Sequence, residues 1–351
     1  MSGRALRRSL FLPILALPLA IPLAIPLAAQ ERFTLEGEQV AIYNLAGEVE
    51  VTQGSGPGVV VEVTRGGGDA ARLRVEQGPS GGRTTLRVVY PGSSIAYPHG
   101  GGNTTIRVRE DGTFGDTDRG RGGRKVEIGR RGDVEAWADL RILVPAGRRL
   151  AVRLAVGSLA ARDVASNLSL DTSSGDITAE RLEGDLDMDT GSGNVVATGI
   201  RGQLNIDTDS GDVTVSDATV GALGIDTGSG SVRVDGFKAE ALEVDTDSGD
   251  VTATGDAGRV LVDTGSGSVS LSLGAGLQNV SVDTGSGNVT VLIPEGYGAR
   301  VHLETSSGDL EVGVPLQLLR RGGDLLEGTI GDGTGSVDVE TGSGHISLRR
   351  R

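Results

Sequence analysis

The sequence has no cysteine and few aromatic residues, and both absences exclude ways of building and using a protein. Without cysteine, neither disulfide bonds nor thiolate metal sites can hold the fold together. Aromatic residues make up 3% of the chain, and the three histidines, His99, His302 and His345, stand in distant segments. A histidine-rich zinc site, a Ser-His-Asp triad and an aromatic platform for sugars therefore have little support. We expect no catalytic residue and no cofactor, and the chain is not expected to be an enzyme.

Basic residues are also scarce relative to acidic ones. The chain has 33 Lys and Arg against 47 Asp and Glu, which gives a formal net charge of −14. Such a surface repels phosphate backbones, so no nucleic-acid partner is expected, even though residues 119–124 read Arg-Gly-Arg-Gly-Gly-Arg. Glycine is abundant, with 58 of 351 residues, and a hydrophobic content of 37% argues against a disordered chain.

The first 29 residues have the features of a secretory signal peptide. Arginines at positions 4, 7 and 8 precede an apolar run from Leu10 to Leu27, and Ala28 and Ala29 form a small-residue cleavage site. Four prolines within the run oppose a membrane-spanning helix, because each interrupts helical hydrogen bonding. We therefore expect an exported protein of the periplasm, the outer surface or the medium, with no transmembrane segment after signal cleavage.

The rest of the chain is dominated by a repeated motif, Asp/Glu-Thr-x-Ser-Gly-x-apolar. Successive copies begin 18 to 21 residues apart, except for a gap of 36 residues before the last copy. Apolar residues alternate with polar ones, as in Leu204 and Ile206, which is the pattern of strands with one buried face. A glycine such as Gly211 stands where the chain must turn. The copies begin at Asp171, Asp189, Asp207, Asp226, Asp245, Asp263, Asp283, Glu304 and Glu340.

A unit this short cannot bury its apolar stripe alone, so units must stack on one another. The sequence therefore predicts an all-β, single-domain parallel β-solenoid (β-helix) with about 18–20 residues per rung. We divide the chain into a signal peptide at 1–29, an N-terminal β-strand segment at 30–145 and solenoid repeats at 146–351. The N-terminal segment contains a Gly/Arg-rich loop at about 90–125, and the repeats contain an irregular insert at about 313–335.

These features together resemble a known family. The signal peptide, a Gly-Glu-Val unit at 47–49, a Val-Pro-x-Gly turn at 144–147 and serial Thr-Ser-Ser-Gly-Asp-Ile units such as 172–177 carry the resemblance. They are similar to the bacterial putative-adhesin family of short-rung β-strand repeats, a domain of unknown function that resembles the head domains of putative autotransporter adhesins. The family offers no catalytic residues to carry over.

The resemblance implies a non-catalytic exported adhesin, or a structural or binding protein of the cell envelope. Its partners would be polymers or proteins of the envelope or of a cell surface. A periplasmic, envelope-associated accessory protein is the alternative. A calcium-binding β-roll and a polysaccharide-acting β-helix enzyme are more distant alternatives.

The aspartates that begin the repeats need a physical account. Alternation points each Asp away from the core, while the following Thr points toward the core or lines the corner. Parallel stacking then makes an outward row of like charges. Two unit charges about 5 Å apart repel by about 1 kcal/mol in water. We expect each Asp to accept a backbone hydrogen bond at the turn and to be screened by salt. We call this row the Asp ladder: Asp171, Asp189, Asp207, Asp226, Asp245, Asp263 and Asp283.

Calcium bound along the Asp ladder is the alternative account, because carboxylate oxygens are ligands of that ion. Calcium β-rolls, however, use a glycine-rich turn every nine residues, about twice as often as this sequence provides. The string Asp-Thr-Gly-Ser, as at Asp283, also matches the surroundings of the catalytic aspartate in pepsin-like proteases. Those enzymes need two aspartates that face each other, whereas stacked repeats would place the aspartates in one row.

Overall fold

A computed structural model describes residues 30–115 and 122–351. The signal peptide predicted at 1–29 lies outside these residues. The described part is all-β, with 30 strands and a single 3-10 helix of three residues, Ala70–Arg72. None of it forms a helix with the length and apolar character needed to cross a membrane.

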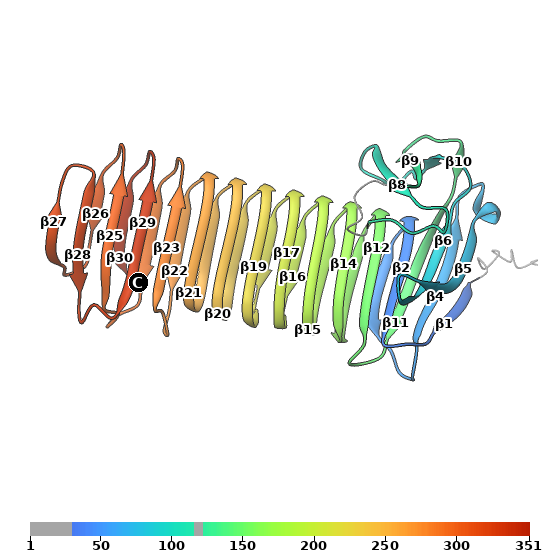
Figure 1. Cartoon of the computed structure of the whole chain (residues 1–351), viewed down its shortest axis with the longest axis horizontal. Coiled ribbons are helices and arrows are strands. Elements are labelled where there is room, and N and C mark those ends of the chain that lie inside the picture. Colours follow the sequence, from blue (N-terminus) through green and yellow to red (C-terminus); the bar gives the residue numbers. More distant parts are fainter. Residues whose placement is uncertain (1–29, 116–121) are drawn as a thin grey trace, which may run out of the picture.

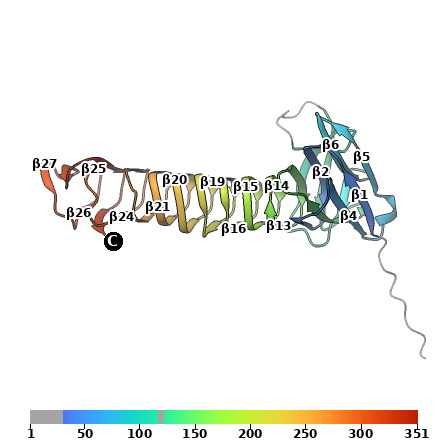
Figure 2. The same ribbon diagram turned by 90° about the horizontal axis from the view of Figure 1, so that it is seen from below.

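The repeats form two rows of parallel strands that run along the molecule (Figure 1). The chain passes from one row to the other and back, as in β17 (Arg201–Ser210), β18 (Val213–Ser216) and β19 (Thr219–Ser229). Figure 2 shows the resulting rungs edge-on, with one row on each side. Leu186 pairs with Leu204 and Ile206 with Ile225, so partners in the central rungs are 18 or 19 residues apart.

We call the row that carries the motif aspartates the Asp row and the other the return row. In spatial order, the Asp row contains β2 (Gln39–Ala46), β12 (Arg149–Val156), β14 (Asn167–Ser174), β15 (Ile177–Ser192), β17, β19, β20 (Val232–Ser248), β21 (Val251–Ser266), β23 (Asn279–Thr284), β29 (Gly335–Thr341) and β25 (Ala299–Thr305). The return row contains β11 (Trp137–Val144), β3 (Val49–Gln53), β13 (Leu159–Ala165), β16 (Val195–Thr198), β18, β22 (Val269–Leu273), β24 (Val289–Ile293), β30 (Ile346–Arg350) and β26 (Leu310–Val312), with the first parts of β15, β20 and β21 between them.

The interior between the rows is filled from alternate positions, as the sequence predicted. Leu204, Ile206 and Val213 are buried, and so is the threonine that follows each motif acid. Gly211 has a φ of 148°, and a Cβ there would overlap the carbonyl oxygen of Gly193 on the neighbouring rung. This turn therefore requires glycine. The buried threonines are Thr172, Thr190, Thr208, Thr227, Thr246, Thr264, Thr284, Thr305 and Thr341.

The N-terminal segment covers the first rungs with further strands. β4 pairs antiparallel with β1 and with β11, and β6 pairs parallel with β2 and antiparallel with β5. In the segment at about 90–125, for which we predicted a loop, the structure instead has strands β7 and β8. Glycines on both sides hide the short alternation of 104–108 in the sequence. The strands are β1 (Glu31–Leu35), β4 (Val59–Gly66), β5 (Arg74–Ser80), β6 (Arg83–Val89), β7 (Ser94–Ala96), β8 (Thr104–Val108), β9 (Arg124–Gly129) and β10 (Val134–Glu135), and β7 to β10 form a separate sheet.

At the far end, the order of the rungs in space differs from their order in the chain. β29 lies between β23 and β25, so Glu340 pairs with Asp283 on one side and with Glu304 on the other. The segment predicted as an irregular insert contains β27 (Gln317–Arg321) and β28 (Leu325–Ile330), an antiparallel hairpin that covers β25 at the end of the row (Figure 1).

Candidate functional site

The structure brings all seven residues of the Asp ladder into one row. Each aspartate is paired in register with its equivalent on the next strand, from Asp171 with Asp189 to Asp263 with Asp283. Glu340 and then Glu304 continue the row. At its start, Arg153 pairs in register with Asp171, and Arg153 Nη1 lies 3.1 Å from Asp171 Oδ2. The like charges are thus compensated by a cation at the first rung.

The middle of the Asp ladder shows the electrostatic cost of this arrangement. Partial burial, and then the neighbouring Asp207, raise the pKa of Asp189, against the opposing effect of Arg153. Partial burial and then Asp226 raise the pKa of Asp207. Partial burial and then Asp245 raise the pKa of Asp226. Burial and the neighbouring like charges therefore both disfavour the charged form of these three carboxylates.

Our prediction that the motif aspartates accept backbone hydrogen bonds at the turn was wrong for these central rungs. The residue just after Ser-Gly has that role. Asp176 Oδ1 accepts from the Asn194 N–H at 2.8 Å, and Asp212 Oδ1 accepts from the Ser231 N–H at 2.9 Å. On rungs such as 171–176 the sequence has one aspartate before Ser-Gly and another after it, and strand alternation sends the first of them outward from the sheet, away from the turn.

Other outward positions avoid neighbouring carboxylates. Two residues before each motif Asp, acidic residues such as Asp187 and Glu243 are separated by neutral residues on the rungs between them. The turn position behaves in the same way. The Asp ladder is unbroken by comparison, so its repulsion is not a general consequence of an acidic composition. The turn residues, in spatial order, are Asp176, Asn194, Asp212, Ser231, Asp250, Ser268 and Asn288.

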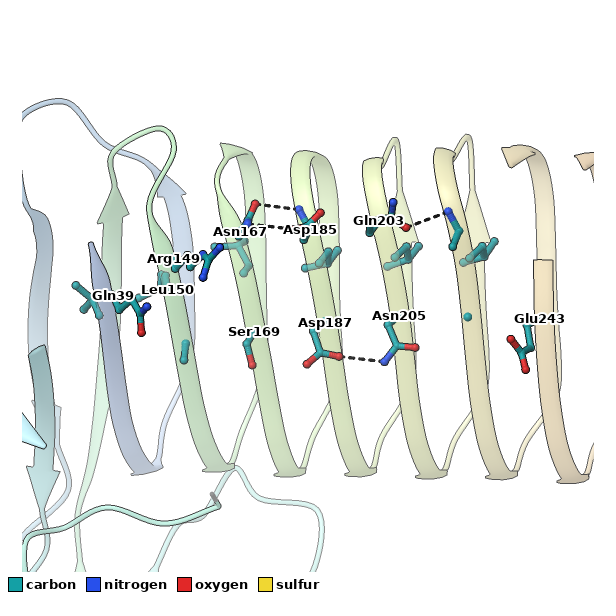
Figure 3. A pocket seen from close by; sticks show the side chains of 18 of the residues that line it. Gln39, Arg149, Leu150, Asn167, Ser169, Asp185, Asp187, Gln203, Asn205 and Glu243 are labelled. Atoms are coloured by element: carbon teal, nitrogen blue, oxygen red, sulfur yellow. Dashed lines mark hydrogen bonds between the residues drawn. The ribbon is translucent and has the colours of Figure 1, made fainter. Parts of the chain in front are cut away.

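A groove of about 640 Å³ crosses the same row from β2 to β20 (Figure 3). The small residues Ala151, Ala222 and Gly224 are part of its lining, and they leave room above the sheet. Sequence reasoning missed the groove, because it depends on which small residues become neighbours on successive rungs. The larger polar residues that line it are Gln39, Arg83, Arg149, Asn167, Ser169, Asp185, Asp187, Gln203, Asn205 and Glu243.

Hydrogen bonds between rungs hold several of these polar groups in place (Figure 3). Asn167 Nδ2 donates to Asp185 Oδ2 at 3.2 Å, and Asn167 Oδ1 accepts from the Asp185 N–H at 3.1 Å. Asn205 Nδ2 donates to Asp187 Oδ1 at 3.1 Å. The groove therefore presents amide and carboxylate groups in fixed positions at the strand spacing, about 4.8 Å.

The other sequence candidates lie apart from this groove. His99 packs edge-on against the ring of Trp137, with ring centroids 5.6 Å apart. His345 Nδ1 lies 3.4 Å from Asp309 Oδ2, whereas His302 lies among glutamates at the end of the Asp row. The protease-like string at Asp283 belongs to the single row of stacked acids, and its in-register neighbours are Asp263 and Glu340.

Comparison with known proteins places this face within a family region. The profile of the family described as Toastrack DUF4097 matches residues 132–349, well over half of the chain. No curated protein matches the sequence. The region 132–349 contains the whole Asp ladder.

Among solved structures, the chain is similar to a putative adhesin from Bacteroides fragilis, with 11% identity, a TM-score of 0.34, and coverage of 91% of this chain and 96% of that one. It is similar to a putative adhesin from Parabacteroides distasonis, with 14% identity, a TM-score of 0.35, and coverage of 92% and 96%. It is also similar to a putative lipid binding protein from Parabacteroides distasonis, with 12% identity, a TM-score of 0.32, and coverage of 92% and 96%.

Proposed function

We propose that this chain, which belongs to the toastrack DUF4097 family, is a non-catalytic exported protein. Its ligand is an extended polymer of the cell envelope or of a cell surface, bound along the Asp row. The observation that carries the proposal is the groove, in which amides and carboxylates on the three successive strands β14, β15 and β17 are fixed by hydrogen bonds between rungs. An adhesin or an envelope-binding protein needs such a surface. Polar groups on neighbouring strands can contact successive units of one extended ligand.

The chemistry of the groove favours ligands rich in hydroxyl or amide groups. Carboxylates such as Asp187 accept hydrogen bonds, and amides such as Asn205 both donate and accept them. Each exposed polar contact contributes little, so useful affinity comes from many rungs acting on one chain. The adjacent Asp ladder repels polyanions, so neutral or cationic polymers are the expected ligands.

Binding of the purified chain to polymers of different charge tests the proposal. We expect retention on a neutral or cationic polysaccharide such as dextran or chitosan, and none on a polyanion such as alginate. Asn205→Ala in the groove should weaken binding several-fold, whereas Thr252→Ala, on the return row, should leave it unchanged. Equal binding by both variants would mean that the groove does not bind the polymer. Release of new sugar ends would refute a non-catalytic function.

The location requires its own experiment. Protease treatment of intact cells, followed by immunodetection of the chain, should remove a surface adhesin. Full protection would instead place the protein in the periplasm, and the same groove would then serve an envelope-associated accessory protein. Detection of the uncleaved chain in the cytoplasm alone would contradict the export predicted from residues 1–29.

A further inference from the structure

Three strands at the far end of the Asp row bring a histidine together with three glutamates. His302 and Glu304 lie on β25, which stands between β29 and β28. Glu340 on β29 pairs in register with Glu304, and Glu327 on β28 pairs in register with His302. The cluster exists because β29 returns to the inner side of β25 while the β27–β28 hairpin covers the outer side.

The two ring nitrogens of His302 face different carboxylates. His302 Nε2 lies 3.5 Å from Glu304 Oε2 and 3.9 Å from Glu340 Oε1. One donor atom from each of these three residues lies within 4.8 Å of the others. On the opposite side of the ring, Nδ1 lies 3.5 Å from Glu327 Oε1. His302 is 34% exposed and the glutamates are more exposed, so an ion can reach the donors from solvent.

This arrangement matches the requirements of a transition-metal site. In tetrahedral coordination with metal bonds of about 2.0–2.2 Å, the donor atoms stand about 3.3–3.6 Å apart, so these side chains need only small rotations to close around an ion. A metal-bound histidine usually donates its other ring N–H to a carboxylate, which fixes the tautomer and orients the ring. Glu327 stands in that place, on the side of the ring away from the other two glutamates.

We propose that His302, Glu304 and Glu340 bind one divalent transition-metal ion, with Glu327 as the residue that positions the imidazole. One nitrogen and two carboxylate oxygens suit Zn²⁺, whereas Ca²⁺ takes oxygen ligands alone. Three protein donors leave one coordination position for water or for an oxygen of a bound partner. The site stands apart from the groove, and it does not depend on the function proposed above.

Titration calorimetry of the full chain with ZnCl₂ tests the site. We expect one tight Zn²⁺ ion per chain, and a loss of affinity of at least tenfold in each of His302→Gln, Glu304→Gln and Glu340→Gln. Glu327→Gln should weaken binding by about tenfold, the lower end of the usual cost of losing the carboxylate behind a metal-bound histidine. His345→Gln is the matched control, because His345 lies at the same end of the molecule with one carboxylate beside it, and its Zn²⁺ affinity should equal that of the wild type.

Two further measurements separate the site from the acidic surface. Co²⁺ should give visible absorption bands that disappear in His302→Gln, and Ca²⁺ in excess should leave Zn²⁺ binding unchanged. Circular dichroism confirms that each variant is folded. The proposal is overturned if the folded wild type binds no Zn²⁺, if His302→Gln binds it as tightly as His345→Gln, or if Ca²⁺ displaces it. The first two results would mean that His302 holds no metal ion, and displacement by Ca²⁺ would mean that carboxylates alone bind the ion.

Discussion

Replacing Asp207 by Asn removes one charge from the middle of the Asp ladder and should stabilise the protein at pH 7. Asp207 lies in register between Asp189 on β15 and Asp226 on β19. Asparagine has nearly the same size and shape, so the substitution changes the charge and little else. The outward position means that no packing of the core is disturbed.

The magnitude follows from the spacing of the strands. Adjacent strands lie about 4.8 Å apart, and two unit charges at that distance repel by about 0.9 kcal/mol in water. The two neighbours of Asp207 together give a repulsion of about 1.7 kcal/mol in water. Solvent screening reduces the effect of charges on exposed side chains, so we expect Asp207→Asn to raise the free energy of unfolding by about 1 kcal/mol at low salt.

The effect should depend on pH in a defined direction. The pKa of Asp207 is raised in the folded protein by partial burial and by Asp226, so the folded state binds the proton more tightly than the unfolded state. Proton binding by Asp207 stabilises the folded state below the unfolded-state pKa of about 3.9, and this stabilisation is lost as the pH rises through the raised pKa. The advantage of Asp207→Asn over the wild type should therefore be full above the raised pKa and should disappear as the pH falls below about 3.9.

Urea denaturation in EDTA, at low salt and in 1 M NaCl, measures this difference. The control is Asp212→Asn, because the neighbours of Asp212 on the adjacent rungs, Asn194 and Ser231, are neutral. Asp212 accepts a backbone hydrogen bond from Ser231, and Asn194 accepts the equivalent bond from Asp212, so an asparagine can fill this position. The control should change the unfolding midpoint little and independently of salt. If Asp207→Asn destabilises the protein in EDTA, or if its effect is the same in 1 M NaCl, repulsion within the Asp ladder is not the operative force.

Three other predictions test the same structure. Thr227→Val should stabilise the protein by about 1 kcal/mol, because the Thr227 hydroxyl is buried without a hydrogen-bond partner in the described part of the chain. Thr190→Val should destabilise it, because Thr190 Oγ1 donates to the Gly175 carbonyl at 3.1 Å. The urea midpoints of the two variants measure both effects, and a loss of stability in Thr227→Val would refute the first. Gly211→Ala should cost at least about 2 kcal/mol, since the new Cβ would overlap the Gly193 carbonyl, and a neutral result in thermal melts would contradict the turn geometry. A screened Asp ladder predicts the same melting temperature with and without EDTA in Ca²⁺-containing buffer, and a clear fall on chelation would favour calcium bound along the ladder.

The parts of the fold that the sequence predicted are those with a local signal. Each rung carries its own alternation and its own turn glycine, so the strand positions, the 18–20-residue period and the inward threonines followed from one repeat unit. The outward Asp ladder followed as well, because in-register stacking turns one aspartate per repeat into a row.

The parts that the sequence did not predict depend on which rungs become neighbours. The gap of 36 residues between Glu304 and Glu340 is about two periods long, and nothing local shows whether the last rung lies outside the previous one or returns inside it. For the same reason His302, Glu327 and Glu340 could not be assigned to one cluster. The groove also needed the register between rungs, since it depends on small residues that become neighbours only in the coil.

The returning last rung has a consequence for the order in which the molecule can assemble. β25 and β26 are synthesised before β29 and β30 but lie farther out, and their inner neighbours in the described structure are those later strands. A coil that grew rung by rung as the chain is synthesised would stop at β24, because β25 and β26 could not join it before β29 and β30 are in place. Closure of this end is therefore a late and cooperative step, in which residues 335–350 enter between two segments that precede them in the chain.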